Sequence, residues 1–155
     1  QQLDAVSWKN KKVVNLVHER FIPVRISGDN QRELFKQHLV TWTPTIVIND
    51  YEGKEHYRFT GFLSPEELCS RILLEGAKTS LDLKNYELAI NWLNEVIENY
   101  PGSFAIPEAI FYSGVAKYLY SHNPKPLKEG WIRLSQEFSQ SEWALRAKPY
   151  ALLND

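Results

Sequence analysis

The sequence contains very little sulfur: its 155 residues include one cysteine, Cys69, and no methionine. A single cysteine excludes an intrachain disulfide, and it excludes a dithiol redox centre built from these residues alone. Because Cys69 shares an apolar helix face with Ile72 and Leu73, we expect a buried structural thiol. The chain starts at Gln1, as a mature product or a fragment would, so the compartment stays open, with the cytoplasm favoured.

The sequence also lacks an excess of charge of either sign. The net charge is −1 and acidic and basic residues are interspersed, so nothing indicates nucleic acid or an anionic membrane as a partner. No apolar run approaches the roughly 20 residues that a membrane-spanning helix needs. With 43% hydrophobic and 24% charged residues, the composition predicts a soluble globular protein.

Groups that hold metals or phosphates are scarce as well. The four histidines are scattered without a pair at ligand spacing: His18, His38, His56 and His122. We therefore expect surface imidazoles, no metal and no other cofactor. No glycine-rich phosphate loop and no nucleophile elbow appears.

The first half of the chain alternates helix and strand signals. Apolar residues at helical spacing predict a helix over residues 11–21, with Asn10 as its N-cap. Residues 22–27 are short and β-branched, which predicts a strand that ends at the turn residues 28–30.

A second helix is expected after this turn, followed by a hairpin. Asp29 or Asn30 is the expected cap of the helix. Its expected apolar face consists of Leu34, Phe35, Leu39 and Val40. Residues 45–49 and 55–60 read as two strands joined by a turn that carries Gly53.

The second half reads as helix throughout. The first of these helices begins at Ser64-Pro65, a capping serine followed by a proline at the first helical position, and runs to about Leu83. Its expected buried side carries Leu68, Cys69, Ile72, Leu73, Gly76 and Ala77. Four more helices are predicted over residues 85–99, 107–120, 126–138 and 141–152.

These helices contain an internal repeat. Shifting the chain by 38 residues places Gly76 on Gly114 and Val96 on Leu134. A small residue in the first helix of each pair lets the second helix approach closely. The pattern resembles tetratricopeptide repeats, with four additional residues between the two units.

Three segments carry a resemblance to the thioredoxin-like family: 42–48 (WTPTIVI), 53–55 (GKE) and 61–67 (GFLSPEE). In addition, residues 4–21 resemble the broken helix that follows the redox motif in bacterial members with a W/H-C-x-x-C centre. The resemblance covers residues 1–77. It implies an α/β chain, a thioredoxin-like fold that is N-terminally incomplete, followed by an all-α tetratricopeptide-like tail. We place the first domain at 1–77 and the helical region at 78–155, sharing helix 64–83.

The resemblance also implies a peptide-binding site at Trp42, Thr43 and Pro44. In the family the bond before this proline is cis, and it turns the main chain of the preceding residue outward, where an extended peptide pairs with it. An ordinary trans proline at the end of a loop is the alternative. Trp42 fits either contact with substrate or packing against the active-site helix.

The departure from the family lies in the cysteines and in one strand. Active members carry C-x-x-C at the start of the helix that leads into this chain, so the second cysteine would fall immediately before Gln1. The family's central strand, between the strands at 22–27 and 45–49, is also missing. Either the chain is a fragment, the reading we favour, or the 22–27 strand pairs directly with 45–49, because unpaired buried main-chain groups are costly.

Two functions remain open at this point. In its complete form the protein would be a thiol–disulfide oxidoreductase whose dithiol lies upstream of Gln1. The alternative is a non-catalytic binding module. Either has a protein or peptide partner, and in the tail a short groove could present Lys78, Tyr112 and Leu119. The tail helices could instead extend and stabilise the α/β domain or make a subunit contact. The oligomeric state is open.

Overall fold

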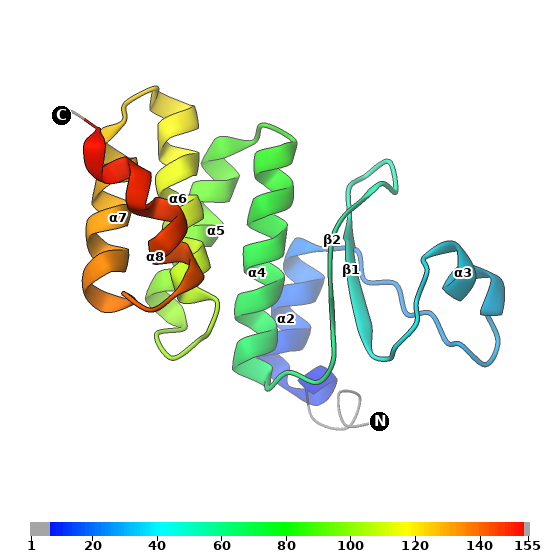
Figure 1. Cartoon of the computed structure of the whole chain (residues 1–155). Coiled ribbons are helices and arrows are strands. Elements are labelled where there is room, and N and C mark those ends of the chain that lie inside the picture. The colour runs from blue at the N-terminus through cyan, green and yellow to red at the C-terminus, as the bar shows by residue number, and fades with distance from the viewer. Residues whose placement is uncertain (1–6, 154–155) are drawn as a thin grey trace. The chain divides into compact units, whose positions relative to one another are not determined.

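The computed structural model describes residues 7–153 (Figure 1). The chain divides into two compact units, residues 1–69 and 70–155, and each is described by itself. The division falls inside helix α4 (Pro65–Asp82), eight residues before the point expected from the sequence. Among the described residues, no helix is long and apolar enough to cross a bilayer.

The described part of unit 1 begins with a broken helix, as expected. A 3₁₀ turn, η1 (Ser7–Lys9), precedes helix α2 (Lys11–Arg20), and the side chain of Asn10 caps α2 by accepting the amide of Lys12. This confirms the predicted helix and its N-cap. The expected start of the broken helix, residues 4–6, lies outside the described residues.

The prediction of a strand over residues 22–27 is wrong. These residues have no regular secondary structure, and Ile22 and Val24 are 93% and 78% exposed. A strand needs a neighbour that pairs with its amides and carbonyls. Within the described residues the sheet contains β1 and β2 alone, so the direct pairing of 22–27 with β1, the alternative to a fragment, does not occur either.

Helix α3 (Arg32–Gln37) is shorter than its apolar pattern predicts. Its N-cap is Gln31, and neither Asp29 nor Asn30 caps it. Gln31 uses its side-chain oxygen to accept the amide of Ser27 across the preceding turn. The expected apolar face is also shorter, because the chain leaves the helix before Leu39, which takes a left-handed conformation (φ 49°) and is exposed.

The predicted hairpin is confirmed. Strand β1 (Thr45–Asn49) pairs antiparallel with β2 (Glu55–Thr60), with Ile46 opposite Phe59. The turn carries Gly53 at φ 82°, a backbone conformation that glycine adopts without steric cost. Two main-chain hydrogen bonds frame the hairpin, from the Asp50 amide to Lys54 at the turn and from the Gly61 amide to Pro44 at the open end.

Helix α4 follows the hairpin and begins as predicted. Ser64 caps it through the amide of Glu67 at 3.4 Å, with Pro65 at its first position. The predicted apolar side is buried: Leu68, Cys69, Ile72, Leu73, Gly76 and Ala77.

Unit 2 is helical throughout its described part, and its helices fall where the sequence predicts them. They are α5 (Tyr86–Asn99), α6 (Ile106–Ser121), α7 (Lys125–Glu137), α8 (Glu142–Ala147) and the 3₁₀ helix η2 (Lys148–Leu152). Helix α5 packs on α6, α6 on α7, and α7 on α8 (Figure 1). The core between α6, α7 and α8 consists of Ile106, Ile110, Leu134, Ala144 and Ala147.

Gly114 sets the distance between α6 and α7. A Cβ atom at this position would lie 2.9 Å from the main-chain oxygen of Pro126, a separation that real Cβ atoms do not reach. On the facing helix, a Cβ atom at Gly130 would meet its nearest neighbour, the carbonyl oxygen of Ile110, at an ordinary 3.5 Å. The close approach expected from a small residue at position 114 is therefore present in this helix pair. The assignment to the tetratricopeptide family stays a prediction.

Replacing Gly114 and Gly130 by alanine should change the free energy of unfolding in opposite directions. Gly114→Ala should lower the free energy of unfolding by about 1–3 kcal/mol, because the backbone of α7 must move away. Gly130→Ala, the matched control, should raise it by about 0.5–1 kcal/mol, because alanine is the better helix former and the site has room. Urea unfolding of both variants measures the difference, and equal effects at the two sites would contradict this account.

Candidate functional site

The candidate site in unit 1 is the segment between α3 and β1. Thr41, Trp42 and Thr43 are exposed there, and Trp42 is 69% exposed. The Thr43–Pro44 peptide bond is cis. Three of the residues predicted to bind a peptide, Trp42, Thr43 and Pro44, therefore stand together at the entrance of strand β1.

Hydrogen bonds fix this segment on both sides of Thr43. The hydroxyl of Thr45 donates to the carbonyl of Trp42 at 2.6 Å, and the amide of Gly61 donates to the carbonyl of Pro44 at 2.9 Å. Thr43 itself makes no hydrogen bond with any described residue. Its amide and carbonyl are thus held in place by their neighbours, and within residues 7–153 nothing pairs with them.

A surface recess of about 280 Å³ lies directly beside this segment. It is lined by Phe35, Val40, Thr41, Trp42 and Thr43. The ring of Phe35 and the side chain of Val40 are apolar, and no charged side chain lines the recess. An uncharged side chain of a bound peptide would fit such a surface.

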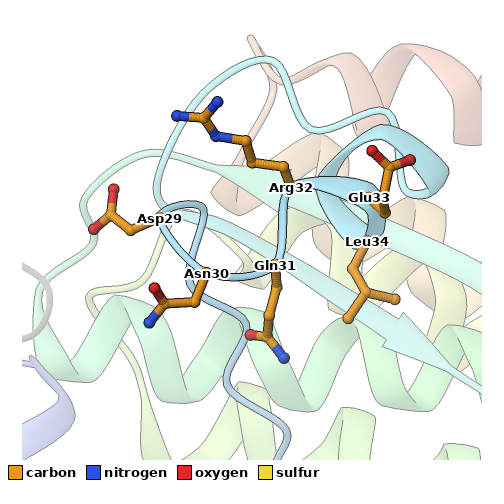
Figure 2. Close-up of a pocket in the computed structure, with 6 residues that line it drawn as sticks. All are labelled: Asp29, Asn30, Gln31, Arg32, Glu33 and Leu34. Atoms are coloured by element: carbon orange, nitrogen blue, oxygen red, sulfur yellow. The ribbon is translucent and has the colours of Figure 1, made fainter.

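A second recess of about 420 Å³ surrounds the start of α3 (Figure 2). Its lining consists of five polar residues and one leucine. These residues are Asp29, Asn30, Gln31, Arg32, Glu33 and Leu34. In Figure 2 the charged ends of Asp29, Arg32 and Glu33 point in different directions and do not converge on one point. We assign no chemistry to this recess.

Asp50 and His56 close the turn of the hairpin that carries the site. The side-chain oxygens of Asp50 accept the amides of Glu52 and Lys54 and contact Nε2 of His56 at 2.9 Å. The hydrogen bond with His56 lowers the pKa of Asp50; burial opposes this effect, and the two amides add to it. His56, expected as a surface imidazole, has a side chain that is only 6% exposed.

No redox or metal centre forms within residues 7–153. Cys69 is 1% exposed, which agrees with the expectation of a buried thiol. No cluster of histidine, cysteine and carboxylate side chains that could hold a metal ion occurs in the part of the chain that is described.

In unit 2 the three residues expected to face a groove lie on α4 (Lys78) and α6 (Tyr112 and Leu119). Lys78 is buried, and its Nζ contacts Glu108 at 2.7 Å and Glu75 at 2.9 Å. Tyr112 and Leu119 are half-buried, and the Tyr112 ring lies 5.4 Å from Nζ of Lys78. A groove that these residues line stays a prediction, in which Lys78 would already be engaged by two carboxylates.

Arg71 completes an ion cluster with Lys78 and the two glutamates. Its guanidinium contacts Glu75 at 2.6 Å and Glu108 at 3.2 Å. Burial alone would lower the pKa of Lys78, but the hydrogen bond with Glu108 and the charge of Glu75 outweigh it and raise that pKa. This cluster was not predicted from the sequence. The spacing of Arg71, Glu75 and Lys78 along one helix could have indicated part of it, whereas nothing local identifies Glu108.

The tertiary structure also brings together an aromatic group on α6, α8 and η2. The ring centroids of Tyr112 and Trp143 are 5.5 Å apart, and Phe111 lies 5.3 Å from Trp143 and 5.9 Å from Tyr150. The guanidinium of Arg146 lies 5.0 Å from the Trp143 ring. Burial raises the pKa of Tyr112 and of Tyr150.

Comparison with known proteins supports the assignment of the first unit. Residues 1–74 match the family model of the thioredoxin-like domain. The match covers the broken helix, the exposed segment around Thr43, the hairpin and the first part of α4. No curated protein and no solved structure matches the chain.

The Asp50–His56 contact should make the hairpin sensitive to acid. A carboxyl whose pKa is lowered by folding stabilises the fold above its unfolded pKa, and this contribution is lost as the pH falls through the folded value. Asp50→Asn should therefore lower the free energy of unfolding at pH 6, and its difference from the parent protein should shrink below pH 4.

Urea unfolding at a series of pH values measures this difference. Asp29→Asn, at an exposed loop aspartate of the same unit, controls for the change in net charge. A difference between the parent protein and Asp50→Asn that is the same at pH 6 and pH 3 would contradict the role assigned to the carboxylate.

Proposed function

We propose that this chain is part of a thioredoxin-fold protein of the thiol–disulfide oxidoreductase type, whose redox dithiol lies upstream of Gln1. The observation that carries the proposal is the exposed residue Thr43 at the entrance of β1, whose main chain makes no hydrogen bond with the described residues, in a part of the chain that matches a thioredoxin-like domain. The described residues would bind and orient the substrate, and the dithiol would carry out the exchange.

Thr43 supports the binding of an extended peptide. Its amide and carbonyl make no hydrogen bond with the described residues, and the hydrogen bonds of Trp42 and Pro44 fix its position. A substrate strand that pairs with Thr43 would gain two main-chain hydrogen bonds with little ordering of the protein. The recess beside Phe35 and Trp42 would take a neighbouring side chain of that strand.

The chemistry that the proposal assigns to the dithiol is an exchange in two steps. One protein thiolate attacks a disulfide sulfur of the substrate, which forms a mixed disulfide and releases one substrate thiolate. The second protein cysteine, as its thiolate, then attacks the mixed disulfide. The substrate leaves with both sulfurs reduced, and the protein holds the disulfide. Cys69 would take no part, because its sulfur is buried.

A non-catalytic binding module is the second candidate. It is favoured by one observation: the only cysteine of these 155 residues is buried in α4. The same segment around Thr43 would then hold a protein partner without any exchange. In both candidates the helices of unit 2 would form two tetratricopeptide-like repeats that extend and stabilise the protein, a reading that the close contact at Gly114 supports.

An assay of insulin reduction separates the two candidates. The protein that includes the residues encoded upstream of Gln1 should accelerate the precipitation of insulin chains with dithiothreitol as reductant. A flat trace from a protein with an intact circular dichroism spectrum would remove the oxidoreductase and leave the binding module.

Trp42→Ala tests the peptide site in either case. The probe is the insulin B chain with its cysteines blocked, titrated into the 155-residue chain and followed through the amide resonances of residues 41–46. Loss of the indole should weaken binding about tenfold, as for an aromatic residue at the centre of an interface.

Tyr51→Ala provides the matched control. Tyr51 is another exposed aromatic residue of unit 1, at the hairpin turn away from Thr43, and its replacement should leave the affinity unchanged. Equal losses in both variants, or resonances at 41–46 that do not move, would refute the proposed site.

A further inference from the structure

Helix α3 ends in a Schellman motif that has leucine at the position where glycine is usual. The amide of Val40 donates to the carbonyl of Phe35 at 2.9 Å, and the amide of Leu39 donates to the carbonyl of Lys36 at 3.0 Å. This motif needs a left-handed residue at position 39, and Leu39 has φ 49°. Glycine adopts that conformation without steric cost, whereas the Cβ atom of leucine crowds the following carbonyl oxygen. The backbone of Leu39 is therefore strained.

The exposure of Leu39 is a second unfavourable feature, because 76% of an apolar residue stays in solvent. Lys84 takes the same place in the Schellman motif of α4, where its amide donates to Leu81 at 2.9 Å and the amide of Asn85 donates to Ser80 at 2.7 Å. At φ 61° its backbone is strained in the same way, but its exposed side chain is polar and suits solvent. Leu39 thus combines backbone strain with an exposed apolar side chain, and Lys84 has the strain alone.

Leu39 directly precedes a residue of the apolar recess beside Thr43. In a Schellman motif the side chains at the positions of Phe35 and Val40 commonly pack on each other, and both residues line this recess. The turn before α3 approaches the Phe35 ring closely, since a Cβ atom at Gly28 would lie 3.1 Å from its Cε1 atom. The end of α3 therefore supplies the recess with apolar side chains that the motif and this turn hold in place.

Folding alone does not account for leucine at this position. Glycine would complete the same motif and relieve the strain. The contacts of Leu39 within the described residues are too few to offset the strain, because the residue is largely exposed. Strained residues are concentrated at sites that bind a ligand, where the ligand makes use of the side chain that the strain presents.

Continuity with the segment around Thr43 indicates which ligand this is. Four residues of extended chain span at most about 14 Å, so a bound strand of about five residues that pairs with Thr43 reaches as far as Leu39. No charged side chain lines the recess between these two positions, and Trp42 is exposed beside it. An extended peptide with apolar side chains matches this surface, and a charged one would lose its hydration there.

We propose that Leu39 is a specificity-determining residue of the peptide site: with Phe35 and Val40 it selects extended peptides that carry large apolar side chains. This inference rests on the proposed binding of a peptide at Thr43. It adds the substrate class, which is an apolar segment of a polypeptide chain. The strained leucine stabilises the complex at the expense of the free protein, as is common where binding and stability compete.

The test titrates two uncharged, end-capped heptapeptides into the 155-residue chain. One has threonine at every position, and the other has leucine at its second, fourth and sixth positions, which share one face of a strand. The amide resonances of residues 39–43 report binding. We expect the leucine peptide to bind the parent chain about tenfold more tightly, as the burial of one leucine side chain gives.

Leu39→Gly should remove this preference and leave the affinity for the threonine peptide unchanged. Its urea midpoint should rise, because glycine relieves the strain. Leu39→Met, which keeps a large apolar side chain, should retain the preference. Lys84→Gly is the matched control: it relieves the same strain in unit 2, so its urea midpoint should also rise while both affinities stay those of the parent chain.

Equal affinities of the parent chain for both peptides would overturn this inference and leave the peptide site at Thr43 standing. If neither peptide moves the resonances of residues 41–43, the proposed peptide site itself is wrong, and the inference falls with it. A lower urea midpoint for Leu39→Gly would show that the leucine serves stability and would also overturn the inference. So would resonances of residues 39–42 that shift with protein concentration alone, because the surface would then join two copies of the chain.

Discussion

The pairing of β1 with β2 is the constraint on which the candidate site depends. Because Pro44 uses its carbonyl to accept the amide of Gly61, the chain on its N-terminal side is held at the open end of the hairpin. Thr45 fixes the carbonyl of Trp42 in the same way from within the strand. Thr43 lies between these two anchors, and its main chain makes no hydrogen bond with any described residue, as the proposed recognition of an extended chain requires.

The two units are stabilised by different interactions. The hairpin of unit 1 is stabilised by main-chain hydrogen bonds and by the carboxylate of Asp50. This carboxylate accepts two main-chain amides and contacts the imidazole of His56. Unit 2 relies on close helix packing at Gly114 and on a buried core. Its buried charges are paired, because an ammonium group such as that of Lys78 tolerates burial only beside carboxylates, here Glu75 and Glu108.

Local chemistry explains why most elements were predictable. The cap of α2 by Asn10, the start of α4 at Ser64-Pro65 and the hairpin turn at Gly53 are each decided by a few neighbouring residues. The apolar residues of α4 recur at helical spacing, which predicted the buried side of that helix. The thioredoxin-like assignment of the first unit likewise followed from short motifs, and residues 1–74 match the domain model.

The predictions of secondary structure were wrong where a residue or strand distant in the sequence decides the local conformation. Residues 22–27 have the composition of a strand, but no described strand lies in place to pair with them. The apolar pattern of α3 continues to Val40, yet the helix ends at Gln37, because the chain turns at Leu39 into the segment that leads to Trp42.

The sequence by itself determined the positions of the helices and the hairpin, because capping, turn chemistry and periodicity act over a few residues. Only the tertiary structure decided that Glu108 meets Lys78 and Arg71, and that Tyr112 meets Trp143. These contacts join residues 30 or more positions apart in the chain. Their geometry depends on how closely the helices approach, and the packing of the whole unit sets that distance.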